Sequence, residues 1–274
     1  MSFKLIAIDM DGTLLNSQNE VSQRTRRAIE AASEKGVYVV LATGRILKSA
    51  TNYSDDLNLY KPIIASNGAL IVDENKNILY EKTMDKSIVE KIIELGTKNQ
   101  IYYHLYSEDS FYSRVYVEEI AQFYNTKSMA KSEINFKLFK EPREIIEDKD
   151  LKIFKFIFID EDSDKLNRFR NELNTLGNLN ICSSWSNNIE VMDREVSKGN
   201  SLRYLSKILN IPREQIIAIG DNENDLSMID YAGLGVAMGN GEEIVKSAAD
   251  MITSTNDEDG VAKVIEKYIL GIGD

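Results

Sequence analysis

Acidic, basic and hydroxyl side chains follow several short apolar runs of this 274-residue chain. Asp9 and Asp11 end the first run, Thr43 follows the second and Asp221 ends a later one, while Lys198 begins a helical pattern. Such runs are typical of strands buried in a sheet. In an open α/β sheet, ligands bind beyond the carboxyl ends of the strands. The spacing therefore places these side chains where a reaction would take place.

The chemistry that unites these residue types is phosphoryl transfer. A carboxylate can attack phosphorus and form an aspartyl-phosphate. Attack by one anion on another requires charge neutralisation, which Mg²⁺, a lysine and a hydroxyl supply. A second carboxylate protonates the leaving alkoxide and then takes a proton from water. Each motif alone also fits a plain structural role, such as a turn at Gly12 or a solvated helix start at Lys198, but the set favours the reaction.

Composition argues against several classes of protein. Hydrophobic residues make up 43% of the chain, enough for a proper core, and the net charge of −11 argues against general nucleic-acid binding. The single cysteine, Cys182, rules out an internal disulfide and a cysteine-based zinc site. The single histidine, His104, argues against a histidine metal site and a Ser-His-Asp triad. The sequence has no apolar stretch of ~18 residues and no signal peptide, so we expect a cytoplasmic protein without a membrane span.

Strand and helix patterns alternate at both ends of the chain. Ser22 and Gly36 predict the start and the end of a helix between the first two strands. Further helices are expected after Lys198 and over residues 261–269. The strands expected in these two parts are residues 3–8, 37–42, 63–66, 70–72, 78–80, 216–221 and 233–238. This alternation predicts one α/β unit that is built from both ends of the chain.

The middle of the chain has a different sequence pattern, with more aromatic residues. A helical pattern begins near Asp85, and a second helix is expected to end at Leu176. Aromatic-rich or apolar strands are expected at residues 101–106, 111–112, 151–159, 180–183 and 189–192. We therefore predict a catalytic core of residues 1–82 and 196–274, with an α/β domain of residues 83–195 inserted between its two parts.

Four sequence motifs, taken together, resemble those of the haloacid dehalogenase superfamily. They are Asp9-x-Asp11-Gly12-Thr13-Leu14, Thr43-Gly44-Arg45, Lys198-Gly199 and Gly220-Asp221-x-x-Asn224-Asp225. Ser66-Asn67-Gly68-Ala69 and residues 220–228 are similar to the Cof-type branch, which carries a large α/β cap between its second and third motifs. The resemblance implies an α/β hydrolase with a doubly wound, Rossmann-like parallel-sheet core and identifies residues 83–195 as the cap.

The resemblance implies a magnesium-dependent mechanism that is carried by aspartates. Asp9 would be the nucleophile and a Mg²⁺ ligand. Asp11 would be the general acid and base, and it would offer its backbone carbonyl to the metal. Asp221 would be a further Mg²⁺ ligand, with Asp225 in support.

The resemblance also implies a binding site for the phosphoryl oxygens. Its members would be Thr43, Lys198, Asn224 and the backbone amides of Met10 and Gly44. One departure from the family pattern is Glu195, where relatives often have glycine. This position belongs to the hinge into the core, so the departure concerns hinge flexibility and leaves the chemistry unaffected.

Two other activities remain open beside a phosphatase. Ion-pumping relatives carry Thr in place of Asp11 and dehalogenase relatives lack that acid, so Asp11 favours a phosphatase or a phosphomutase. The sequence separates these two poorly. A non-catalytic sensor of phosphorylated metabolites has no need of both Asp9 and Asp11. The complete set therefore favours a phosphatase that acts on a small phosphorylated metabolite.

Side chains of the cap are expected to select the substrate. The candidates are Trp185, Asn187 and Asn188 at the tip of a polar hairpin, and Tyr102, His104 and Tyr106 on a strand. Most tyrosines of this region would instead pack the cap's own sheet, and a structural role suits His104 better than a catalytic one. Aromatic faces stack on sugar C–H surfaces and amides bind hydroxyls, so a sugar phosphate is the expected substrate. The sequence predicts neither the individual metabolite nor the oligomeric state.

Overall fold

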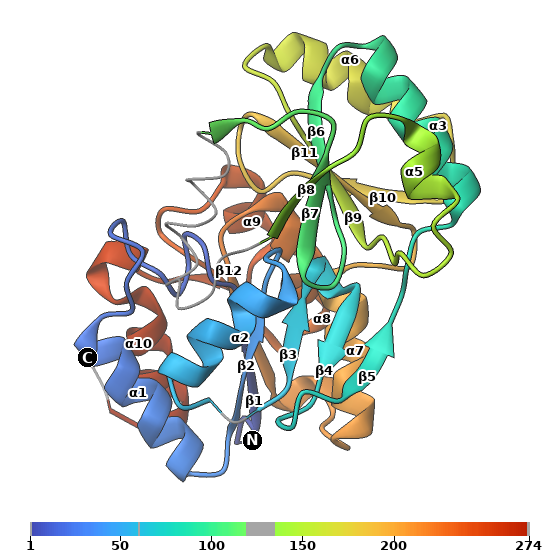
Figure 1. Ribbon diagram of the computed structural model, residues 1–274. Coiled ribbons are helices and arrows are strands. Elements are labelled where there is room, and N and C mark those ends of the chain that lie inside the picture. The colour runs from blue at the N-terminus through green and yellow to red at the C-terminus, as the bar shows by residue number, and fades with distance from the viewer. Residues whose placement is uncertain (1, 60, 119–134, 273–274) are drawn as a thin grey trace.

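The computed structural model describes residues 2–59, 61–118 and 135–272, which form two β-sheets (Figure 1). The strands of the large sheet are β1 (Leu5–Ile8), β2 (Tyr38–Ala42), β3 (Ile63–Ala65), β4 (Leu70–Val72), β5 (Ile78–Glu81), β12 (Ile216–Gly220), β13 (Leu234–Ala237) and β14 (Met251–Ile252). Their order across the sheet is β14-β13-β12-β1-β2-β3-β4-β5. The strands from β14 to β3 are parallel, whereas β4 and β5 form an antiparallel hairpin at the edge.

The central strands of the large sheet end level with one another. Ile8 of β1 lies opposite Ile219 of β12 and opposite the penultimate residue of β2. The next residues along the chain are Asp9 after β1, Thr43 after β2 and Asp221 after β12. The parallel register therefore brings these three residues to the same edge of the sheet.

Helices cover both faces of the large sheet. They are α1 (Gln23–Glu34), α2 (Leu47–Asp56), α7 (Lys198–Ile208), α8 (Leu226–Tyr231), α9 (Glu243–Ala248) and α10 (Gly260–Ile265), the last of which continues as a π-helical turn over Glu266–Leu270. Alternate side chains of a strand point to opposite faces. Ile6 and Ile8 share a buried cluster with α1, α2 and α10, whereas Leu5 and Ala7 share one with α7 and α8. The large sheet is thus doubly wound, as predicted.

The ends of α1 follow from two sequence signals. The Ser22 hydroxyl accepts a hydrogen bond from the Thr25 amide at 3.1 Å and caps the first turn. Gly36 has a φ of +79°, the left-handed conformation that often follows a helix. Ala28, Ile29 and other buried residues form the stripe that packs on the sheet.

Residues 83–195, which we call the insert, carry the small sheet. Its strands are β6 (Tyr102–Tyr106), β7 (Ser110–Ser113), β8 (Asn135–Leu138), β9 (Lys155–Ile159), β10 (Leu179–Cys182) and β11 (Asn188–Asp193), in the order β10-β11-β9-β6-β7-β8. The helices of the insert include α3 (Lys86–Lys98), α5 (Pro142–Ile146) and α6 (Ser163–Asn174). Figure 1 shows this green-to-yellow region above the end of the large sheet at which α2 begins. We refer to residues 1–82 and 196–274 as the core.

The two faces of the small sheet meet different surroundings. Phe156 and Phe158 of β9 pack with apolar residues of α3 and α6. Ile157 alternates with them and lies on the other face, where it clusters with Tyr106 of the insert and Ile46 of the core. One face of the small sheet therefore belongs to the insert's own interior, and the other packs on the core.

The predicted fold class is confirmed, and several details differ. The segment 151–159 is a strand only from Lys155, which lies opposite Tyr106 at the end of β6, and the Ile153 carbonyl accepts a hydrogen bond from the Met84 amide at 2.8 Å instead. The helix expected over 261–269 is α-helical only to Ile265. Helix α2 was not predicted, since its sequence is largely polar and no side chain caps its start. Among the described residues, no helix combines the length and the apolar character needed to cross a bilayer.

Candidate active site

A buried chain of ion pairs lies at the carboxyl edge of the large sheet. Lys198 Nζ donates to Asp9 Oδ1 at 2.5 Å and to Asp225 Oδ1 at 2.6 Å. The lysine begins α7, Asp9 follows β1, and Asp225 ends a 3₁₀ turn that follows β12. The Lys198 side chain is fully buried. Its ammonium group is therefore a fixed positive charge beside Asp9.

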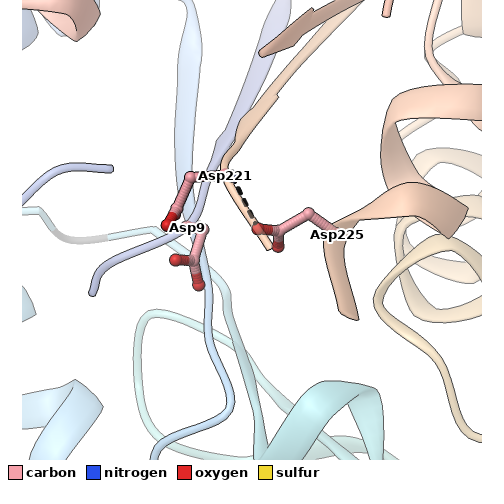
Figure 2. Close-up of side chains that lie close together, drawn as sticks. All are labelled: Asp9, Asp221 and Asp225. Atoms are coloured by element: carbon pink, nitrogen blue, oxygen red, sulfur yellow. Dashed lines mark hydrogen bonds between the residues drawn. The ribbon is translucent and has the colours of Figure 1, made fainter. Parts of the chain in front are cut away.

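Asp221 completes an acidic cluster with Asp9 and Asp225, and Figure 2 shows that the three side chains lie close together. One oxygen of each carboxylate lies within 4.8 Å of the others. Thr13 donates to Asp221 Oδ1 at 2.6 Å. Asp225 Oδ2 accepts the amides of Asp221 and Asn222 at 2.9 and 3.1 Å. Because both oxygens of Asp225 are bonded within the protein, this residue shapes the loop and holds Lys198.

Gly12 permits the close approach of the first motif to Asp221. It has a φ of +83°, and a Cβ at this position would overlap the Asp221 carboxylate. Any other residue would therefore be strained in the backbone and would also clash with that side chain. The glycine of the first motif is needed for the geometry of the acidic cluster.

Burial and mutual repulsion make the cluster electrostatically unfavourable without a further cation. Burial raises the pKa of Asp9 to about 7, although the charge of Lys198 opposes this effect. Burial, together with the charges of Asp9 and Asp225, also raises the pKa of Asp221 well above its usual range. Burial alone would lower the pKa of Lys198, but the carboxylates of Asp225 and Asp9 outweigh it and raise that pKa.

The donor set fits a magnesium ion. Mg²⁺ prefers carboxylate oxygens and retains water or phosphate as its other ligands. Asp9 and Asp221 offer such oxygens from neighbouring strand ends. A divalent cation would also offset the burial and the mutual repulsion that raise their pKa values. The acidic cluster of Asp9, Asp221 and Asp225 is therefore suited to hold Mg²⁺.

The loop after β2 is joined to two other loops at the site. The Thr43 carbonyl accepts a hydrogen bond from the Asn67 amide at 3.0 Å, and Thr43 Oγ1 accepts one from the Arg45 amide at 3.1 Å. Asn224 Nδ2 donates to Asn67 Oδ1 at 3.3 Å. A Cβ on Gly44 would lie 2.8 Å from the same Asn67 oxygen. The segments after β2, β3 and β12 thus form one connected surface.

Asp11 is held by the arginine of the second motif. Arg45 Nε and Nη2 donate to the two oxygens of Asp11, each at 2.7 Å. The Arg45 guanidinium also lies 4.8 Å from the centre of the Tyr53 ring. Burial alone would lower the pKa of Arg45, but the Asp11 carboxylate outweighs it and raises that pKa. This bidentate pair fixes the position of the Asp11 carboxylate.

A pocket between the core and the insert connects these groups. The core contributes polar groups and one apolar side chain, and the insert contributes most of the apolar wall. The lining residues are Asp9, Asp11, Gly44, Arg45, Ile46, Ser49, Tyr106, Phe111, Ile157, Ser184, Trp185, Glu190, Asn222 and Asn224. The pocket is therefore polar where Asp9 and Asp11 lie and aromatic on the side of the small sheet.

The three candidates at the hairpin tip have different surroundings. Trp185 lines the pocket. Asn188 is buried, and its Oδ1 accepts the amides of Ser184 and Trp185 at 3.0 and 3.1 Å, so it fixes the tip from within. Asn187 Nδ2 instead donates to Glu161 at 3.0 Å on the exposed side of the insert. Of this group, only Trp185 is placed to touch a ligand in the pocket.

The candidates on β6 also differ. Tyr106 lines the pocket, whereas Tyr102 lines a separate depression beside Arg114. His104 is fully buried, with its ring 5.7 Å from that of Tyr106 and 5.5 Å from that of Phe111. Burial, with a smaller contribution from the Lys155 charge, lowers the pKa of His104 to about 3. The imidazole is therefore neutral near pH 7 and belongs to the packing beneath the pocket wall.

A family model described as haloacid dehalogenase-like hydrolase matches residues 6–265. The chain belongs to the haloacid dehalogenase-like hydrolases. The 5-amino-6-(5-phospho-D-ribitylamino)uracil phosphatase YcsE of Bacillus subtilis is 36% identical to it, over 98% of this chain and 97% of YcsE. Phosphatase YwpJ of the same organism is 33% identical over 97% of this chain and 100% of YwpJ. The solved structure of a haloacid dehalogenase-like hydrolase from B. subtilis is 33% identical, with a TM-score of 0.88 over 96% of this chain and 99% of its own.

These comparisons confirm the predicted family, fold and enzyme class, a phosphatase of the haloacid dehalogenase type. The residues of its four motifs come together in one place. Those that line the pocket, lie in the ion-pair network or belong to the acidic cluster are Asp9, Asp11, Gly44, Arg45, Lys198, Asp221, Asn224 and Asp225. Thr43 is buried within the loop that carries Gly44, and Met10 is buried between the two acids of the first motif.

Three charged residues of this hydrolase lie at the site without a role assigned from the sequence. Arg45 belongs to a recognised motif, but its pairing with Asp11 was not predicted. Glu190 lines the pocket, and Lys155 lies behind it as the first residue of β9. A charged residue that begins the apolar strand Lys155–Ile159 was the available signal, since a buried lysine needs a partner.

Proposed function

We propose that this haloacid dehalogenase-like hydrolase is a Mg²⁺-dependent phosphatase of small phosphorylated metabolites, in particular sugar or polyol phosphates, and that it acts through an aspartyl-phosphate on Asp9. The observation that carries the proposal is the contact of Asp9 with Lys198 at the wall of a pocket that Asp11 also lines. A carboxylate nucleophile, a fixed cation and a second carboxylate thus share one space.

In the first step, an Asp9 oxygen attacks phosphorus and the bond from phosphorus to the ester oxygen breaks. Asp11 gives a proton to the departing alkoxide. The groups that would hold the phosphoryl oxygens are Lys198, Thr43, Asn224 and the amides of Met10 and Gly44. Such fixed donors stabilise the transition state because they need no reorganisation during the reaction.

In the second step, Asp11 takes a proton from water, the water oxygen attacks phosphorus, and Asp9 is released together with phosphate. Arg45 binds both oxygens of the Asp11 carboxylate and so orients the group that carries the proton in both steps.

Asp9 and Asp221, with the backbone carbonyl of Asp11, would hold Mg²⁺. When bound, the ion reduces the repulsion between the carboxylate nucleophile and the anionic substrate. Asp225 holds the loop of Asp221 in place through the amides that it accepts.

The shape of the pocket supports a polyol phosphate with a ring or another apolar part. Tyr106, Phe111 and Trp185 form the wall opposite the aspartates. Such rings stack on sugar C–H faces or on planar groups. The relative YcsE, which is named as a phosphatase of a ribitylaminouracil phosphate, supports the same class of substrate.

Release of inorganic phosphate from a substrate panel tests this proposal. The panel contains sugar phosphates, polyol phosphates, nucleotides, a phosphopeptide and p-nitrophenyl phosphate, each with Mg²⁺. We expect free phosphate from sugar or polyol phosphates at the highest kcat/KM, and none above background from an Asp9→Asn variant. A phosphate group that moves within the metabolite without being released would instead indicate a phosphomutase.

A further inference from the structure

A buried ion pair joins the insert to the core beside the second motif. Lys155 of β9 and Glu190 of the neighbouring antiparallel strand β11 have side chains that are only 1% and 3% exposed. Lys155 Nζ donates to Glu190 Oε1 at 2.9 Å. The reaction described above assigns no role to either residue.

Each member of the pair also binds a residue of the core. Lys155 Nζ donates to the Gly44 carbonyl at 2.7 Å and lies 4.5 Å from the centre of the Tyr106 ring. The other carboxylate oxygen of Glu190 accepts a hydrogen bond from Asn67 Nδ2. The pair thus holds two different core segments at once, the one after β2 and the one after β3.

These two segments surround the expected phosphoryl site. The Asn67 amide is bonded to Thr43, and its side-chain oxygen is bonded to Asn224. A Cβ on Gly44 would lie 2.8 Å from Asn67 Oδ1 and 3.3 Å from Lys155 Nζ, so the Gly44 backbone is enclosed by both. A displacement of the pair would therefore shift the peptide groups that face the substrate.

Stability alone does not account for this arrangement. Two buried charges lose their hydration. A protein with apolar residues of similar volume in place of such a pair is often equally stable or more stable. The side chains on this face of the small sheet, such as Tyr106 and Ile157, already provide an apolar environment. The pair is therefore better explained by what it holds than by the free energy of unfolding that it contributes.

We infer that Lys155 and Glu190 are positioning residues for the phosphoryl-transfer site, a statement that rests on the proposed function. Lys155 fixes the Gly44 peptide, and Glu190 fixes Asn67 and, through it, Asn224. They do so only while the insert lies against the core. The insert then completes the phosphate site in addition to selecting the substrate, so even p-nitrophenyl phosphate depends on it.

The double variant Lys155→Met/Glu190→Leu tests this inference. It removes both charges together, so no unpaired charge is left in the interior and the fold persists. The measurements are kcat, KM and the inhibition constant of inorganic phosphate, with p-nitrophenyl phosphate and with the preferred sugar phosphate. We expect kcat to fall about 10–100-fold for both substrates, with weaker phosphate inhibition and an unchanged or higher Tm.

Arg170→Met is the matched control. Arg170 of α6 also links the insert to the core, through Glu223 at 2.5 Å, but its described partners are Glu223 and the Ile181 carbonyl. Its exposure is greater than that of the buried pair, so we expect kcat and phosphate inhibition to change less than about fivefold. Glu190→Gln keeps an acceptor oxygen and the side-chain volume. Its kcat and its inhibition by phosphate should therefore be intermediate between those of the wild type and those of the double variant.

The outcomes separate this inference from the proposed function. Wild-type kcat and wild-type phosphate inhibition in the double variant would overturn the inference. So would a loss of equal size in Arg170→Met, because the pair would then act only by holding the insert closed. If the double variant fails to fold, full activity of Glu190→Gln would have the same meaning. A wild-type protein that releases no phosphate from any substrate would instead refute the phosphatase activity itself.

Discussion

The large and the small sheet place functional side chains in different ways. In the large sheet, Asp9 and Asp221 follow the ends of parallel strands, which meet at one edge whatever packs above them. In the small sheet, Tyr106 and Glu190 belong to strands whose face lies on the core, and they reach the pocket only through that contact. The core therefore positions its acidic cluster by its own sheet, whereas side chains of the insert reach the site only when the insert is docked on the core.

The largest effect is expected at the end of β1. Asp9→Asn keeps the side-chain volume and removes the attacking charge, so turnover should fall by several orders of magnitude while the far-UV circular dichroism is unchanged. Asp225→Asn, which leaves the nucleophile in place, should keep more of the activity. A folded Asp9→Asn enzyme with near-normal turnover would show that Asp9 is not the nucleophile.

Removal of the metal tests whether the acidic cluster, which includes Asp221 after β12, requires Mg²⁺ for activity. Chelator should abolish activity, and Mg²⁺ should restore it. Ca²⁺ should inhibit, because its larger and looser ligand shell misaligns the nucleophile and the phosphate. Asp221→Ala should raise the Mg²⁺ concentration that gives half-maximal rate. Full activity in excess chelator would contradict a metal-dependent core.

Asp11→Asn separates the two acids of the first motif. Esters with poor alkoxide leaving groups should lose the most, by about 10²–10⁴-fold, because they need a proton from Asp11. Bond cleavage in p-nitrophenyl phosphate should suffer less, since its leaving group needs little protonation. Burst kinetics measure that first step directly. Equal damage to it for both classes of ester would leave Asp11 with a structural role only.

The sequence was sufficient for the fold class and for the motifs of the core. Parallel strand ends converge by geometry, so residue types that follow predicted strands, such as Asp9, Thr43 and Asp221, could be assigned to one site from their positions along the chain. The alternation of strands and helices likewise predicted one α/β core, and the family resemblance of the motifs implied its doubly wound sheet. Both inferences depend on local patterns that survive any change in the neighbouring region.

The insert could not be read in the same way. The pattern of β9 predicts a buried strand, but it does not reveal which face meets the core or that Lys155 reaches Gly44. The neighbouring amides Asn187 and Asn188 are chemically equivalent, yet one bonds outward to Glu161 and the other inward to the hairpin tip. Their directions depend on the conformation of the hairpin tip and on tertiary packing, which the sequence does not specify locally.

Substitutions at the hairpin tip test, through their effect on KM, whether the insert selects the substrate. Trp185→Ala removes a ring from the pocket wall, so KM should rise, by about 5–50-fold for the most affected sugar phosphate. The ranking of sugar phosphates by kcat/KM should change as a result. Asn188→Ala should act in the same direction, because the tip loses its internal hydrogen bonds. Asn187→Ala is the matched control and should leave KM unchanged. If Trp185→Ala slows all substrates equally, the hairpin tip does not determine specificity.

The smallest effect concerns stability at acid pH. His104 has a folded-state pKa of about 3, below the value of ~6.5 for an unfolded chain, so it stabilises the fold above pH ~6.5 and this contribution is lost as the pH falls toward 3. The loss is at most about 1.4 kcal/mol per pH unit. The Tm of the wild type should therefore fall more between pH 7 and 4.5 than that of His104→Phe. If Tm depends on pH in the same way for both proteins, the pKa of His104 does not differ between the folded and the unfolded state.

Chemical trapping of the covalent intermediate tests the central assignment most directly. The enzyme is quenched during turnover of the preferred sugar phosphate, treated with borohydride, which reduces an acyl phosphate, and mapped by peptide mass spectrometry. The Asp11→Asn variant, supplied with p-nitrophenyl phosphate, provides the stronger signal: the leaving group of this ester needs little protonation, and loss of water activation should let the intermediate accumulate. We expect reduction at Asp9 in both proteins and none in Asp9→Asn. Reduction at another carboxylate, or phosphate release with no reduced residue in either protein, would contradict the mechanism.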